Sequence, residues 1–238
     1  MHTSRSQYQS LAQFLFITLF LILLSGQSGW AQARRLSSRS AIVVDERLAV
    51  LRAAPQFSAP FLRRIGRGRI VTLLETQRGR DGVVFYRVAV TRRTRGWLQR
   101  EAIVAPSRAG DDARLLGLIK ASRDFDRLGR ARIFLDVFPR SPHRPAILLI
   151  LGEEAEKAAL KLSHEAARRL DTEELSATGA SLASYFLNYR GLDRYRRQGI
   201  VFTFDPRTRK FHYDGAAWRE LNRRYRGSVE ASVIRQRE

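Results

Sequence analysis

The 238-residue chain contains no cysteine. This absence excludes disulfides, thiolate metal ligands, cysteine nucleophiles and a lipid-modified N-terminal cysteine. Lysine is scarce, because only four of the 43 basic residues are lysines: Lys120, Lys157, Lys161 and Lys210. Hydrophobic residues make up 44% of the chain, which is enough to form a core without covalent cross-links.

The motifs of the common hydrolases are also missing. No H-E-x-x-H, G-x-S-x-G or Ser-x-x-Lys pattern occurs, and His143, His164 and His212 lie too far apart to form a close zinc-binding pair. The adjacent acids Glu153 and Glu154 fall on different faces of the expected helix, so they do not form a two-carboxylate glycosidase site. We therefore expect a protein without catalytic residues, cofactor or metal.

Basic residues dominate the charge, which is +20 at neutral pH. Such a surplus attracts anionic partners. The arginines are spread along the chain and do not form one stripe with interleaved aromatics, so nucleic acid is not an expected partner. A solvated basic surface is the simpler interpretation of the same pattern.

The N-terminus has the layout of an export signal. Arg5 precedes an apolar run of 11 residues at 14–24, and Ala31-Gln32-Ala33 resembles a cleavage site. The run is shorter than the about 20 residues of a spanning helix. We therefore expect residues 1–33 to be a signal peptide and the protein to be periplasmic or otherwise extracytoplasmic. The alternative is an uncleaved anchor, and membrane contact is expected only through that anchor or through surface charge.

Residues 41–105 have the pattern of short strands separated by turns. Alternation is clear at 48–52 and 83–90, and turn clusters occur at 66–68 and 78–82. Five or six short strands with Gly-rich turns between them predict a small all-β barrel.

Four motifs in this region resemble the bacterial SH3-like (SH3b) domain, in that family's order. Residues 48–55 (LAVLRAAP) are similar to its LNVRSGPS opening, 66–71 (GRGRIV) to its kGekv turn, 85–88 (FYRV) to its WykV strand, and 96–98 (GWL) to its GWv signature. Ala49 and Phe85 depart from the family's usual Asn and Trp.

The resemblance implies a non-catalytic recognition module of cell-envelope proteins. A groove on such a barrel would be lined by five residues: Arg52, Phe85, Tyr86, Arg87 and Trp97. The aromatic side chains can stack on a sugar or a peptide, and the arginines can pair with a carboxylate. The alternative is that the aromatic residues fill the small barrel.

Residues 111–238 have the pattern of helices. Apolar residues recur at three- and four-residue steps over 148–170, and Pro145 suits the first turn of that helix. Further helices are expected at 111–125, 126–138, 172–189 and 214–225, with a last one from Ser228. A β-hairpin is expected at 199–213 around a Pro-containing turn, its aromatics covering the helices.

Residues 131–141 and 218–228 share a weak internal similarity: a helix ends in an aromatic, and a serine then begins the next helix. This resembles the joint of tetratricopeptide (TPR)-like repeats, although the spacing differs from that of a regular array. The resemblance implies a helical surface that binds a partner protein.

Together these observations predict an α+β protein: an SH3-like barrel at 41–105, then a TPR-like helical domain at 111–238 with one hairpin. The boundary is expected near 105–110, where proteolysis should cut first. The expected function is binding of cell-wall or other anionic envelope material by the barrel and of an envelope protein by the helices. Two alternatives remain open: a purely structural scaffold, and a cell-wall hydrolase in the helical part.

Overall fold

The computed structural model describes residues 37–170 and 172–236. The predicted signal peptide, residues 1–33, lies outside this range. The described residues belong to one compact unit. None of their helices is both long and apolar enough to cross a membrane.

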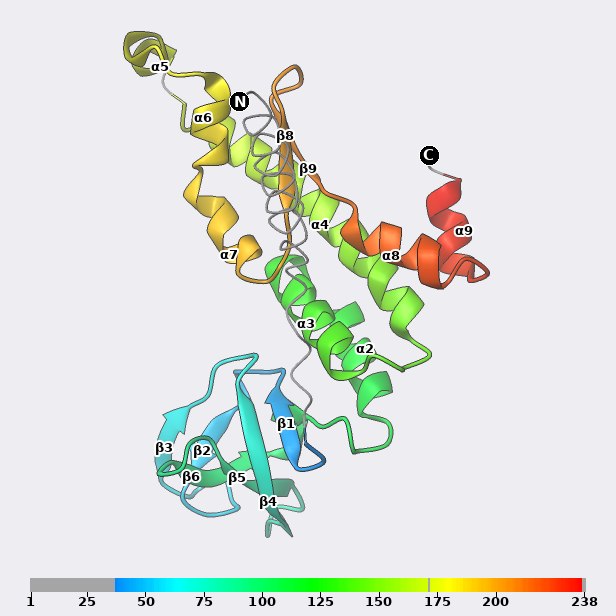
Figure 1. The fold of residues 1–238 in the computed structure, drawn as a ribbon. Coiled ribbons are helices and arrows are strands. Elements are labelled where there is room, and N and C mark those ends of the chain that lie inside the picture. The colour runs from blue at the N-terminus through cyan, green and yellow to red at the C-terminus, as the bar shows by residue number, and fades with distance from the viewer. Residues whose placement is uncertain (1–36, 171, 237–238) are drawn as a thin grey trace, which may run out of the picture. The chain divides into compact units, whose positions relative to one another are not determined.

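The first part of the chain forms a seven-stranded antiparallel sheet (Figure 1). Its strands are β1 (Ser40–Val43), β2 (Val50–Arg52), β3 (Phe61–Arg64), β4 (Ile70–Arg78), β5 (Val84–Ala89), β6 (Arg95–Gln99) and β7 (Ile103–Val104). The short 3₁₀ helix η1 (Arg100–Ala102) precedes β7. Together with the helices that follow, the sheet confirms the predicted α+β class.

A closed barrel is not found among the described strands. The strand order is β3-β2-β6-β5-β4-β1-β7, and the two edge strands, β3 and β7, do not pair with each other. Strand β7 is only two residues long, and the chain then leaves the sheet toward the first helix. The strands thus lie where the sequence predicts them, but the sheet stays open.

Helices and one β-hairpin form the rest of the described chain (Figure 1). They are α2 (Asp111–Ala121), α3 (Asp124–Val137), α4 (Arg144–Ala167), α5 (Thr172–Thr178), α6 (Leu182–Leu187), η2 (Arg190–Leu192), α7 (Asp193–Arg196), α8 (Ala216–Arg224) and α9 (Val229–Arg235). The longest, α4, has Pro145 in its first turn and packs against α3, α8, α9 and the hairpin. Its predicted apolar stripe is confirmed, since Leu148, Leu151, Ala155 and Leu162 are buried.

The predicted hairpin is confirmed as β8 (Phe202–Asp205) and β9 (Lys210–Tyr213). Phe211 is fully buried, and its N–H donates to Oγ of Ser163 on α4 at 2.7 Å. The hairpin aromatics therefore cover the helices, as expected.

Two helix predictions were wrong in extent. The first helix ends at Ala121, because the chain turns at Ser122 and Asp124 takes a positive φ of 49°. The element predicted at 172–189 is split into α5 and α6 around Gly179, whose φ of 61° is the left-handed conformation that glycine tolerates best.

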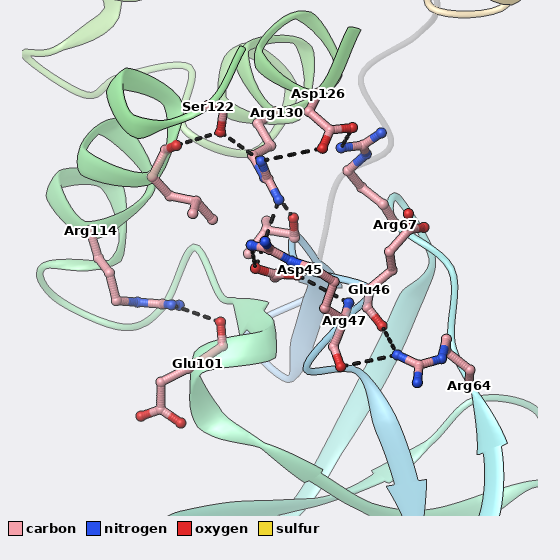
Figure 2. Close-up of polar contacts among 12 residues, drawn as sticks. Asp45, Glu46, Arg47, Arg64, Arg67, Glu101, Arg114, Ser122, Asp126 and Arg130 are labelled. Carbon is pink, nitrogen blue, oxygen red and sulfur yellow. Dashed lines mark hydrogen bonds and ion pairs between the residues drawn. The ribbon is translucent and has the colours of Figure 1, made fainter. Parts of the chain in front are cut away.

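Sheet and helices share buried contacts. Ile42, Val44 and Val104 of the sheet side lie in the same hydrophobic cluster as Leu115 and Phe134 of the helices. Polar contacts accompany this cluster, as Figure 2 shows: Arg67 Nη1 lies 2.7 Å from Asp126 Oδ1 on α3. Both apolar and charged contacts therefore connect the sheet to the helices.

Candidate functional site

A row of five side chains crosses the face of the sheet. Strand register pairs Phe61 with Arg52, Arg52 with Trp97, Trp97 with Arg87, and Arg87 with Glu75. Directly paired residues of neighbouring strands project to the same face. The order along this cross-strand row is thus aromatic, cation, aromatic, cation, anion, from β3 to β4.

The members of the row differ in how much of each is exposed. Phe61 is 61% exposed, whereas Trp97 is 8% exposed. Nη1 of Arg87 lies 3.6 Å from Oε2 of Glu75, and about half of each side chain is exposed. Nη1 of Arg52 donates to the carbonyl oxygen of Ala59 at 3.0 Å, which holds the 53–60 loop beside the row. The most accessible cation of the row is thus Arg87.

Phe85 lies under that loop. It is fully buried, and the ring of Phe57 meets it edge-on at 5.6 Å. Gly79 lies so close to the same loop that a Cβ on it would overlap the carbonyl oxygen of Pro55. Phe85 therefore supports the loop and is not available to a ligand.

Tyr86 faces the opposite side of the sheet. It packs against the hydrophobic cluster that contains Val88 and Leu98, and the guanidinium of Arg108 lies 5.3 Å from its ring centroid. Side chains alternate along a strand, so the consecutive residues Tyr86 and Arg87 cannot share one face.

Of the five predicted site residues, the structure thus brings Arg52, Arg87 and Trp97 together, buries Phe85 on the same face beneath the 53–60 loop, and places Tyr86 on the opposite face. The sequence reasoning missed Phe61 and Glu75. Phe61 carries a signal that was available, since it is an aromatic at the start of a short strand after Pro60. Glu75 was not recognisable, because a bulge in β4 between Leu73 and Glu75 shifts its register.

A second group of interest is Asp112, Ser141 and His143, which contains the residue types of a nucleophilic triad. The hydroxyl of Ser141 donates to Oδ2 of Asp112 at 2.7 Å, and this bond lowers the pKa of Asp112. The backbone N–H of His143 donates to the same hydroxyl oxygen at 3.2 Å. An activated serine would instead donate to an imidazole nitrogen. The group therefore acts as a brace between α2 and the start of α4.

His212 and Glu156 form a histidine–carboxylate pair, with Nδ1 and Oε1 3.2 Å apart. The second carboxylate oxygen accepts the N–H of Tyr213 at 2.9 Å, so Glu156 fastens the hairpin to α4. Within the part of the chain that the structure describes, no three His, Asp or Glu side chains gather to hold a metal ion.

Comparison with known proteins found no matching family model, curated protein or solved structure. The arrangement of the chain's own residues is therefore the basis for assigning a function. Among the groups described above, the cross-strand row combines exposed charge with an exposed aromatic side chain.

Proposed function

We propose that the protein is an exported, non-catalytic binding protein of the cell envelope. Its sheet binds cell-wall or other anionic envelope material through the cross-strand row, and its helical part binds an envelope protein. Binding of envelope material by the sheet is supported by the strand register, which places Arg52 and Arg87 on either side of Trp97.

The chemistry of the row favours a carboxylate-bearing ligand. A guanidinium offers two parallel N–H donors to a carboxylate, which strengthens and orients the pair. Trp97 is almost completely buried, so its main role is to space the two arginines. Phe61 supplies the apolar surface on which a sugar ring can stack. Glu75 competes with the ligand for Arg87.

For the fold, we propose an opened relative of the SH3-like barrel. This proposal is supported by the three motif segments that contain Arg52, Arg87 and Trp97, which form the adjacent strands β2, β5 and β6. We propose a TPR-like origin for the helices, supported by the contacts of α2 with α3 and of α3 with α4. Consecutive helices that pack on each other are the unit of such repeats.

Export is the part of the proposal that rests on residues 1–33. Mass spectrometry of the protein purified from its own cells should find Arg34 at the N-terminus. A protein that keeps residues 14–24 would instead support a retained anchor and contradict cleavage.

Retention on purified cell-wall sacculi tests the cross-strand row. Arg87→Ala should weaken retention by about 2- to 5-fold, the range expected for one exposed charged contact. Glu75→Gln should strengthen retention, because it removes the competing carboxylate. The matched control is Arg92→Ala, which removes the same charge from an exposed residue between β5 and β6. All charge-driven retention should fall with salt, since the screening length is about 10 Å at 0.1 M.

Two outcomes contradict the proposal. Equal retention of wild type and Arg87→Ala at low and at high salt would remove the row as a binding site and favour a scaffold. Equal losses in Arg87→Ala and Arg92→Ala would show that only net charge matters.

A further inference from the structure

The helical part contains a surface cavity of about 480 Å³, wide open to solvent, between the end of α4 and helix α6. This volume lies within the range of about 300–1,000 Å³ that is usual for small-molecule sites. The cavity is far from the cross-strand row in sequence, and the described residues that line it fall within 166–190. A ligand in this cavity would therefore bind independently of cell-wall material on the sheet.

One wall of the cavity is held rigidly. Phe186 is 1% exposed, and its ring stacks on Phe204 with centroids 4.4 Å apart. The same ring meets Phe211 edge-on at 5.5 Å. Because β8 and β9 fix both partner rings, Phe186 forms a rigid support behind the cavity.

Tyr189 forms a second fixed wall. Its hydroxyl lies 3.4 Å from Oε2 of Glu165, and the guanidinium of Arg169 lies 5.7 Å from its ring centroid. Gly191 leaves the room that the ring needs, because a Cβ at that position would overlap Cε1 of Tyr189. The ring orientation is thus set from three sides.

The lining is apolar with a positive rim. Leu170, Ala180 and Tyr189 supply apolar surface, whereas Arg169 and Arg190 are exposed cations. No acidic side chain is among the described residues that line the cavity. An occupant that fits both features has an apolar body and one anionic group.

We propose that this cavity binds a single-chain anionic amphiphile, with the acyl chain against Leu170 and Tyr189 and the carboxylate or phosphate at Arg190 and Arg169. The apolar walls take the chain out of water, and the two guanidinium groups pair with the head group. A cationic or uncharged amphiphile of equal length would gain only the first of these contributions.

Displacement of a fluorescent fatty acid, 11-(dansylamino)undecanoic acid, from the full-length protein measures this preference. The competitors are dodecanoate, dodecanol and dodecyltrimethylammonium, each below its micelle concentration. Dodecanoate should displace the probe at least about 10-fold more effectively than dodecanol, consistent with one charge-assisted contact. Dodecyltrimethylammonium should be the weakest. Equal displacement by all three would overturn the proposal without need of any variant.

Three variants locate the binding. Arg190→Gln should weaken dodecanoate about 10-fold and leave dodecanol unchanged. Arg168→Gln is the matched control, since it removes the same charge from an exposed neighbour outside the cavity lining. Ala180→Trp should fill the cavity and weaken both ligands, with an unchanged circular dichroism spectrum as the folding control. Equal effects of Arg190→Gln and Arg168→Gln would overturn the site.

Vesicles distinguish a free amphiphile from a lipid in a bilayer. If Arg190→Gln also lowers retention on phosphatidylglycerol vesicles, relative to Arg168→Gln, the head group of a membrane lipid is the ligand. If only dodecanoate binding falls, the ligand is a free amphiphile. If both measurements stay at the wild-type level in Arg190→Gln and in Ala180→Trp, the cavity has no such ligand.

Discussion

Nε of Arg130 donates to the carbonyl oxygen of Val44 at 3.0 Å, and the two residues are 86 positions apart in the chain. This bond joins α3 to the loop after β1. The same guanidinium donates from Nη1 to Oγ of Ser122 at 2.6 Å and lies 3.8 Å from a carboxylate oxygen of Asp45 (Figure 2). Arg130 is 5% exposed, so these partners replace water almost completely.

The first prediction concerns this buried cation. Arg130→Met should lower the free energy of unfolding by about 2–4 kcal/mol, because it leaves the Val44 carbonyl and the Ser122 hydroxyl oxygen without their donor and removes one of the two arginines beside Asp45. Urea unfolding followed by circular dichroism measures the change. Arg140→Met, at an exposed arginine beyond α3, should change stability by no more than about 0.5 kcal/mol.

The same experiment tests whether sheet and helices are independent folding units, as the sequence predicts. A shared core and the Arg130 contacts favour a single cooperative transition, observed equally by tryptophan fluorescence and by the helical signal. Two separate transitions, with Arg130→Met shifting only one, would show that the two parts unfold independently.

The second prediction concerns Asp111, at the junction of the two parts. Its Oδ2 accepts the backbone N–H of Ala105 at 2.8 Å and lies 2.7 Å from Nη2 of Arg108, and the side chain is 2% exposed. We expect trypsin to spare the bond after Arg108 in the wild type and to cut it readily in Asp111→Ala. Peptide mapping over time measures this. Early cleavage after Arg108 in the wild type would instead support the sequence-based boundary at 105–110.

Asp111 also illustrates what a sequence pattern can and cannot predict. The pair Asp111-Asp112 correctly marks the start of a helix, but Gly110 is the N-cap residue and Asp111 is turned toward Ala105. The helix start is a local property, so it can be predicted. The partner of the Asp111 carboxylate depends on the position of the chain after strand β7, and a local sequence pattern does not contain that position.

The same distinction applies to the buried charges and to the cross-strand row. The periodic apolar stripe predicts α4, yet nothing in it indicates that Arg144 and Glu220 form a buried pair at 2.8 Å. The motifs with Arg52, Arg87 and Trp97 predict three strands. These strands are neighbours because the order of strands in the sheet differs from their order along the chain, and the motifs do not contain that order. Alternation along β5 was readable and would have separated Tyr86 from Arg87.

The third prediction compares two helical glycines. A Cβ at Gly152 of α4 would overlap the indole of Trp218, whereas a Cβ at Gly117 of α2 would meet nothing within 4 Å. Gly117→Ala should stabilise the protein by up to about 1 kcal/mol through helix propensity. Gly152→Ala should destabilise it by about 1–3 kcal/mol, because displacing the ring costs more than the propensity gain.

A double-mutant cycle assigns the effect of Gly152→Ala to the ring. In a Trp218→Leu background the same substitution should cost less, since the indole is gone. Thermal unfolding of the four proteins measures the coupling. An equal cost in both backgrounds would mean that the contact with Trp218 is not the cause.

The last prediction concerns alkaline pH and Tyr213. Burial raises the pKa of this tyrosine to about 12, while its phenol oxygen accepts the N–H of Ala217 at 2.9 Å. In the unfolded chain the tyrosine ionises near pH 10. Between these two values the unfolded state binds fewer protons than the native state, so stability falls as pH rises. From about pH 9 to pH 11.5 the wild type should lose about 2 kcal/mol more than Tyr213→Phe. Tyr225→Phe serves as the control and should keep the wild-type slope. Parallel pH profiles for wild type and Tyr213→Phe would show that Tyr213 ionises equally easily in both states, which contradicts its burial against α8.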